Sequence, residues 1–229
     1  AGPAGPAGPK GDPGPALASV EALAGIACTT HAGTAGTVTV GPSSDDVITL
    51  RCQSSAPPPP PPPPPPAGSP VVNEVDYDQV GADAGGFVEL YNGSAAAASL
   101  DGLALVFVNG GDGLEYDREI LSGTLAAGGY LVVPAELQNG APDGVALLDT
   151  QTGTLVDALS YEGAIRAAQI GGVTYDLVEG TALDASVADS NTVTGSLIRS
   201  PDGTDSNNAA SDWAFTTMPT PGGANVLAP

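Results

Sequence analysis

The sequence predicts an all-β protein whose largest part, residues 71–225, is a β-sandwich. Runs rich in valine, leucine and aromatic residues recur along this part, and clusters rich in glycine and aspartate separate them. Short strands with frequent turns are typical of β-sandwiches. Eight strands are expected, near 71–77, 86–92, 103–109, 114–121, 129–134, 144–149, 154–161 and 195–199.

Turn signals separate several of these strands, at 110–113 (GGDG), 127–129 (AGG) and 149–153 (DTQTG). Side chains alternate along a strand, so Phe87, Glu89 and Tyr91 would share one face. Residues 181–190 predict either one short helix or a loop. The expected core comprises Val72, Val88, Leu90, Leu105, Phe107, Leu131, Val133, Leu147 and Trp213.

A collagen-like segment occupies residues 1–16. Every third position is glycine, and these residues are Gly2, Gly5, Gly8, Gly11 and Gly14. Only glycine fits at the axis of a collagen triple helix, so the period predicts a homotrimer. Ala1 would fill the last place of a triplet, which predicts a longer Gly-X-Y run upstream. The alternative is a disordered tail rich in glycine and proline.

Residues 17–54 predict a small module with one helix and one β-hairpin. Apolar residues between 17 and 24 keep helical spacing. This helix would pack on its own hairpin or align three chains. The runs 37–40 and 47–52 flank a turn cluster and predict the hairpin. The layout resembles a short cysteine-bracketed module that precedes bacterial surface domains.

Cys28 and Cys52 are the only cysteines of the chain. Two cysteines that bracket a short strand-rich segment predict one disulfide, formed in an oxidising compartment. Closing a loop of this size contributes roughly 3 kcal/mol of stability. The alternative is a free or metal-bound pair. Zinc needs four ligands, and Cys28, His31 and Cys52 supply one too few.

Ten consecutive prolines at 57–66 form the centre of an expected linker, residues 55–70. Such a tract adopts a polyproline II helix and would be a stiff spacer of roughly 30 Å. Proline tracts also bind aromatic grooves, which is the alternative function. The sandwich would follow at 71–225, with a tail at 226–229.

The chain carries 26 acidic and 5 basic side chains, which gives a formal net charge of −21. This charge repels phosphate backbones, so no nucleic acid is expected as a partner. No apolar run approaches the ~20 residues of a membrane-spanning helix, and no membrane insertion is expected. The expected disulfide and collagen-like segment predict an extracellular or cell-surface location.

Six blocks between 71 and 225 resemble the bacterial form of the lamin-tail domain. They are 72–75 (VNEV), 86–92 (GFVELYN), 100–105 (LDGLAL), 125–133 (LAAGGYLVV), 196–205 (SLIRSPDGTD) and 219–225 (PTPGGAN). Leu103 departs from the family, in which tryptophan is common at this place, so core packing is expected to differ there. The resemblance implies an immunoglobulin-like sandwich that serves in interaction and has no catalytic residues.

Two carboxyl groups, Glu74 and Glu89, lie on strands that are expected to be neighbours. Two close acids can perform acid–base catalysis. The resemblance instead implies a structural role for them, with bonds to the backbone, Arg118 or Arg199. The single histidine lies in a separate module, which excludes a Ser-His-Asp set. We therefore do not expect the chain to be an enzyme.

One loop carries four side chains with oxygen donors, which are Asp202, Asp205, Asn207 and Asp212. Calcium prefers such ligands, so this loop is a candidate Ca²⁺ site. The spacing is not that of an EF-hand, and aspartate and asparagine also form turns for their own reasons. Asp112, Glu115 and Asp117 form a weaker candidate. No other cofactor is expected.

Three functions are compatible with these features. The first is a non-enzymatic extracellular fibre or surface adhesion protein that binds an unknown surface or matrix ligand. In this function, the collagen-like stalk forms the trimer and the sandwich is the interaction domain. The second is the receptor-binding tip of a phage tail fibre. The third is the accessory domain of a secreted hydrolase whose catalytic part lies upstream.

Overall fold

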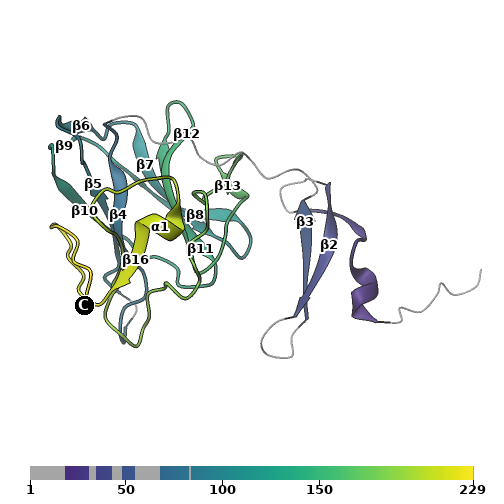
Figure 1. Cartoon of the computed structure of the whole chain (residues 1–229). Helices are drawn as coiled ribbons and strands as arrows, with labels where there is room; N and C mark the ends of the chain where they lie inside the picture. Colours follow the sequence, from purple (N-terminus) through teal and green to yellow (C-terminus); the bar gives the residue numbers. More distant parts are fainter. Residues whose placement is uncertain (1–18, 31–34, 43–47, 55–67, 83, 229) are drawn as a thin grey trace, which may run out of the picture. The chain divides into compact units, whose positions relative to one another are not determined.

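The computed structural model describes residues 19–30, 35–42, 48–54, 68–82 and 84–228. The collagen-like segment with its five glycines, His31 and the proline tract lie outside the described residues. The chain divides into two compact units, Ala1–Pro57 and Pro58–Pro229 (Figure 1). Each unit is described by itself.

The first unit contains a three-stranded antiparallel sheet. Its strands are β1 (Ala27–Thr29), β2 (Ala35–Pro42) and β3 (Ile48–Ser54), with β2 in the centre. The pairing of β2 with β3 confirms the predicted hairpin, whereas β1 was not predicted. The predicted helix is one 3-10 turn, η1 (Val20–Leu23).

The predicted disulfide joins Cys28 on β1 to Cys52 on β3. These strands flank β2, yet the two Cα atoms are only 5.8 Å apart. Strands on either side of a third strand in a flat sheet would lie nearly 10 Å apart. The small sheet is therefore strongly curled, and the disulfide closes it across β2.

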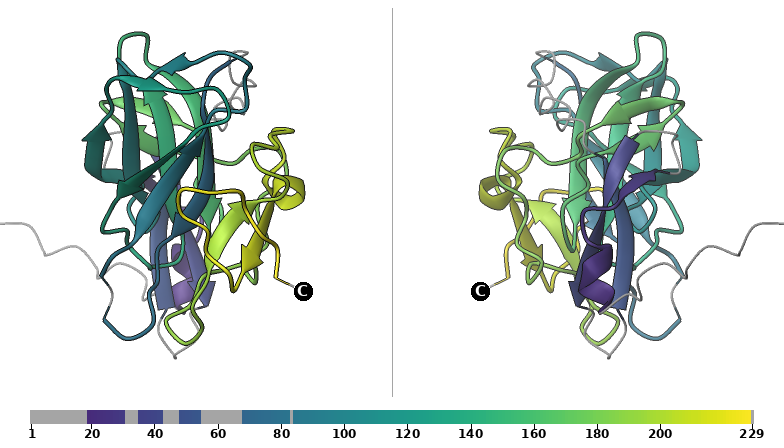
Figure 2. Two further views of the ribbon diagram at one scale, coloured as in Figure 1. Left: turned by 90° about the vertical axis from the view of Figure 1, so that its left-hand side faces the viewer. Right: turned by 90° about the vertical axis from the view of Figure 1, so that its right-hand side faces the viewer.

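The second unit contains two large sheets, of five and six strands, and a small two-stranded sheet of β6 (Ala98–Ser99) and β9 (Thr124–Leu125). The five-stranded sheet has the order β10 (Tyr130–Pro134), β5 (Phe87–Tyr91), β4 (Val71–Asp76), β15 (Ser196–Arg199) and β16 (Trp213–Thr216). The six-stranded sheet has the order β12 (Thr154–Tyr161), β11 (Asp143–Asp149), β7 (Leu103–Asn109), β8 (Leu114–Ile120), β13 (Ala168–Ile170) and β14 (Val173–Tyr175). The C-terminal strands, yellow-green in Figure 2, form one margin of the five-stranded sheet.

All eight predicted strands are present, and no bound differs by more than one residue. The structure adds five short strands and one helix to them. Residues 181–190 form a loop rather than a helix. The added elements are β6 (Ala98–Ser99), β9 (Thr124–Leu125), β13, β14, β16 and α1 (Ala209–Asp212).

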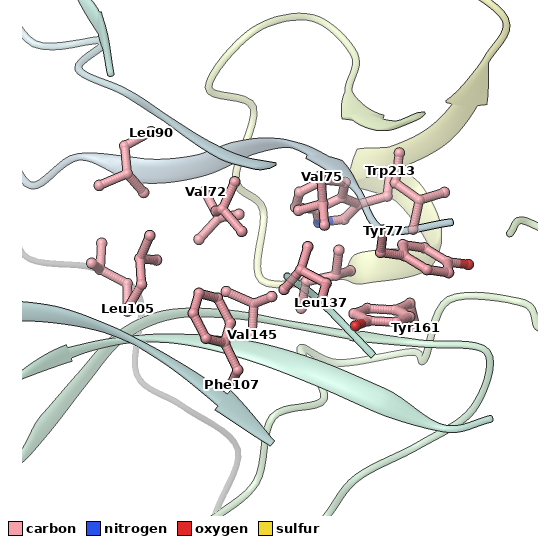
Figure 3. Packing of buried hydrophobic residues seen from close by; sticks show 14 of the residues in the cluster. Val72, Val75, Tyr77, Leu90, Leu105, Phe107, Leu137, Val145, Tyr161 and Trp213 are labelled. Carbon is pink, nitrogen blue, oxygen red and sulfur yellow. The ribbon is translucent and has the colours of Figure 1, made fainter. Parts of the chain in front are cut away.

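The main core lies between the two sheets. Val72, Val75 and Leu90 of the five-stranded sheet face Leu105 and other residues of the six-stranded sheet (Figure 3). Of the nine predicted core residues, only Leu131 and Val133 are half-buried, because they lie on the edge strand β10. All strand pairs of the two sheets are antiparallel except β8 with β13, and this packing is consistent with an immunoglobulin-like β-sandwich.

The outer face of the six-stranded sheet is also covered. A second apolar cluster joins alternate residues of β7 and β11 to Ile165, Ile170 and Leu177 from the segment that follows β12. Both faces of β7 and β11 are therefore buried, which explains why the run LALVFVN is almost continuously apolar. Among the described residues, no helix is long and apolar enough to cross a bilayer.

Candidate functional site

Arg199 lies at the end of β15 with its side chain fully buried. Its Nε donates to the Val72 carbonyl oxygen at 2.8 Å, and its Nη1 donates to the Thr204 carbonyl oxygen at 2.8 Å. The carbon of the guanidinium group lies 5.0 Å from the centroid of the Trp213 ring. A buried guanidinium needs such bonds because water cannot solvate its charge.

Four carboxyl groups surround this guanidinium, and we call the five residues the Arg199 cluster. Asp157 Oδ1 accepts from Nη2 at 2.7 Å, and Glu179 Oε2 accepts from it at 3.3 Å. Asp212 Oδ2 lies 3.5 Å from Nη1, and Asp205 Oδ1 lies 3.7 Å from it. Four ionised carboxylates and one arginine would carry a formal charge of −3.

Burial strongly disfavours this excess of negative charge. Burial, and then the charge of Asp157, raises the pKa of Glu179 to about 10. Burial and the neighbouring Asp157 thus favour the protonated form of Glu179. Burial also raises the pKa of Asp157, against the opposing effect of Arg199. Both shifts favour uptake of a proton, which would lower the negative charge of the cluster.

The loop between β15 and α1 is folded around these acids. Asp212 Oδ2 accepts from the Ser206 backbone N–H at 2.8 Å, and its Oδ1 accepts from the Ser206 hydroxyl at 2.7 Å. Asp205 Oδ1 accepts from the backbone N–H of Asn207, whose φ of 54° is left-handed. The carboxyl groups of Asp205 and Asp212 therefore accept hydrogen bonds from the loop backbone and also lie beside the Arg199 guanidinium.

The four predicted calcium ligands do not form one set. Asp205 and Asp212 both lie beside Arg199 Nη1, and Asn207 follows in the same loop. Asp202 belongs to a different network, in which its Oδ2 accepts from the Tyr130 hydroxyl at 2.8 Å. The group of acids that could share an ion is instead Asp157, Glu179 and Asp205.

Sequence reasoning missed Asp157, Glu179 and the central position of Arg199. One signal was present for Asp157, since it interrupts the otherwise apolar run LVDAL in a predicted strand. A charged residue within a buried strand requires a partner. Nothing in the local sequence of Glu179 distinguishes it from an ordinary surface acid.

Glu74 and Glu89 are paired across β4 and β5, as predicted, and both are buried. Glu74 Oε1 accepts from the Ser196 hydroxyl at 2.6 Å and from the Thr220 backbone N–H at 3.0 Å. Glu89 Oε2 accepts from the Gly222 backbone N–H at 2.6 Å. Burial raises the pKa of both glutamates.

Of the partners predicted as alternatives, the structure shows the backbone, and neither Arg118 nor Arg199 bonds to these glutamates. Arg118 forms a bidentate pair with Glu115, with distances of 2.6 and 2.7 Å. Arg199 has the partners described above. The two glutamates hold the chain's own C-terminal segment, 217–228, and this is a structural use of the carboxyl pair.

Asp202 and Asn225 complete the attachment of this segment. Asp202 Oδ1 accepts from the Asn225 backbone N–H at 2.9 Å. The Asn225 side-chain amide donates to the carbonyl oxygens of Asn73, at 3.1 Å, and Arg199, at 2.8 Å. The C-terminal segment therefore covers a layer of buried polar groups on the five-stranded sheet.

The weaker candidate set does not converge on one point. Asp112 accepts from the Leu114 backbone N–H, and Asp117 accepts from the Arg118 backbone N–H. Glu115 is bound to the Arg118 side chain. These acids have local structural roles at the start of β8.

The comparison with known families agrees with this β-sandwich. Residues 63–163 match the family model of the Lamin Tail Domain. No curated protein and no solved structure matches the chain. The lamin tail domain is an immunoglobulin-like fold of a non-catalytic family, and it points to a role in protein interaction.

The lamin tail match ends shortly after β12. The compact unit continues beyond it, because β15 pairs with β4 inside the matched range and β16 pairs with β15. Arg199 and the C-terminal segment thus lie outside the matched residues. Both nevertheless form hydrogen bonds with residues inside the matched range. The lamin tail region and the segment after it share one core.

Proposed function

We propose that this chain belongs to a non-enzymatic extracellular or cell-surface fibre. The collagen-like residues 1–16 would join three copies, and the β-sandwich would be the interaction domain at the end of the stalk. The proline tract would separate the two. The Gly-X-Y period at 1–16 is the observation that carries this proposal.

Two structural observations support an extracellular setting and a display role. The Cys28–Cys52 disulfide closes the small module next to the collagen-like segment, and such disulfides persist in oxidising compartments. The match to the lamin tail domain supports interaction rather than catalysis. Three linked copies of a weakly binding domain would bind a repetitive surface much more tightly than one copy.

The test is the mass of the protein at 4 °C by sedimentation equilibrium, together with circular dichroism in the collagen region. The 229-residue chain and any longer chain that its gene encodes are measured. We expect about three times the chain mass of 22.3 kDa. Gly8→Ala should shift the assembly toward monomer, because a Cβ does not fit at the triple-helix axis.

The matched control is Ala7→Ser, which changes the neighbouring residue at a place that tolerates a side chain. It should leave the trimer intact. The proposal would be overturned if both the 229-residue chain and the longer chain are monomers without a collagen spectrum. A trimer that Gly8→Ala does not weaken would assign assembly to another part of the chain and would refute the stalk.

A further inference from the structure

The Arg199 cluster contains more acid than its arginine can neutralise. Asp157, Glu179, Asp205 and Asp212 all have side chains with an exposed fraction of 6 % or less. Only one guanidinium faces them within this cluster. Buried charges in proteins are normally paired or bound to a metal ion. The cluster is therefore a place where an added cation would improve the charge balance.

Three of these acids have the geometry of a cation site. Asp157, Glu179 and Asp205 each offer one carboxylate oxygen, and these oxygens lie within 4.8 Å of one another. Calcium binds oxygen at about 2.3–2.6 Å, so two ligands of one ion are at most about 5 Å apart. This spacing is close to that of three oxygen ligands around one Ca²⁺.

The loop beside these acids has three buried oxygens that lack a partner within the described part of the chain. They are Asp205 Oδ2, Asn207 Oδ1 and Asn208 Oδ1. Buried polar atoms without a partner are rare and often mark a missing ion or water. Asp205 is the most informative, because its side chain is 94 % buried and its carboxyl group belongs to the set of three acids.

Backbone contacts place the segment that carries the two asparagines beside Glu179 and Gly180. The Ala209 backbone N–H donates to the Glu179 carbonyl oxygen at 2.9 Å. Asn208 is the N-cap of α1, yet its side chain forms no capping bond. An asparagine at this position normally accepts from the first turn of the helix. Its amide oxygen is thus buried and makes no hydrogen bond within the described residues.

We propose that Asp157, Glu179 and Asp205, with the amide oxygens of Asn207 and Asn208, bind one calcium ion. Carboxylate and amide oxygens are the ligands that Ca²⁺ prefers, and the set lacks the nitrogen and sulfur ligands of zinc or copper sites. The ion would fasten the 205–208 loop to the segment around Glu179. This inference is independent of the proposed fibre function.

The first test is thermal unfolding of the full chain at pH 7.5 in EDTA and in 10 mM CaCl₂. An affinity typical of extracellular calcium modules predicts a rise in Tm of roughly 3–6 °C. MgCl₂ at the same concentration should give a smaller rise, because Mg²⁺ loses its water reluctantly. Asp205→Asn should abolish the rise while preserving the size of the side chain.

The matched control is Asp117→Asn, which removes an exposed acid and should leave the calcium effect unchanged. A second measurement uses Tb³⁺ as a luminescent substitute for Ca²⁺. Trp213 is the only tryptophan and lies beside Arg199, so it should sensitise bound Tb³⁺. Excess Ca²⁺ should quench this signal, and Asp205→Asn should lack it.

Two outcomes would overturn the proposal. One is the absence of both the Tm rise and the Tb³⁺ signal in the wild type, which would show that the cluster binds no cation. The other is an equal rise in the wild type and in Asp205→Asn, which would show only weak binding to the acidic surface.

Discussion

Arg199 shows how strongly one buried residue depends on the others around it. Its guanidinium binds backbone carbonyl oxygens of two segments and the carboxyl groups of three more side chains. A buried ion pair contributes little compared with an apolar pair of the same volume, but the loss of one partner leaves a charge without compensation. Arg199 should therefore be far more sensitive to substitution than an arginine on the surface.

We expect Arg199→Met to lower the free energy of unfolding by about 3–5 kcal/mol, because four buried acids would lose their counter-charge. Urea unfolding monitored by Trp213 fluorescence measures this change. Arg118→Met is the matched control. Arg118 is partly exposed and pairs with Glu115, so its loss should cost about 0–1 kcal/mol. Equal losses in the two variants would contradict this interpretation of the cluster.

The small sheet depends on a position without a side chain. Gly36 lies on the central strand β2, where it pairs with Cys28 of β1. A Cβ at Gly36 would overlap the backbone carbonyl oxygen of Gln53 and lie 3.1 Å from the Cys52 sulfur. The curled sheet and its disulfide therefore require glycine at this place.

We predict that Gly36→Ala disrupts the small module, while Gly41→Ala on the same strand does not. A Cβ at Gly41 would contact nothing within 4 Å. Hydrogen exchange of β2 and β3 is the measurement, and only Gly36→Ala should accelerate it, by tenfold or more. Protection that is unchanged in Gly36→Ala would refute the close packing of the strands around this glycine.

The C-terminal segment is an element without regular secondary structure, and buried polar groups hold it. We expect Asn225→Ala to lower stability by about 1–3 kcal/mol, because the carbonyl oxygens of Asn73 and Arg199 lose a donor. Hydrogen exchange at 219–226 should accelerate more than exchange in the core. Thr217→Ala, at an exposed position of the same segment, is the control and should change neither quantity.

At the scale of the whole molecule, buried acids determine the response to pH. Burial raises the pKa of Asp143 to about 6 and that of Asp189 to about 7, and it also raises the pKa of Glu74 and Glu89. The folded protein thus binds more protons than the unfolded chain between about pH 4 and 7. Stability is then highest on the acidic side of this window and falls as the pH rises through it.

We predict a higher Tm at pH 5 than at pH 7.5, measured by calorimetry at constant ionic strength. Asp189→Asn should flatten part of this slope, because the carboxyl group that accepts from the backbone N–H groups of Tyr77 and Asp78 no longer titrates. Asp184→Asn is the control. Asp184 is exposed and its pKa is lowered, so it changes stability only at pH values below about 4. A Tm that rises toward pH 7.5 would contradict the prediction.

The sequence by itself determined the β-rich architecture, because strand-forming residues and turn signals act locally. The runs 103–109 and 154–161 were predicted with the bounds that β7 and β12 have. The disulfide was also predictable, since the chain has only two cysteines. Strands of two or three residues, such as β6 and β13, were not, because so short a run shows no periodicity.

Only the tertiary structure decided which polar residues meet. Arg199 binds Asp157 and Glu179, which are 42 and 20 positions away in the sequence, and no local pattern links them. Glu74 and Glu89 were predicted as neighbours, but their partners on the C-terminal segment were not. Propensity and periodicity describe the conformation of one segment, whereas the packing of distant segments sets the charge balance of a buried cluster.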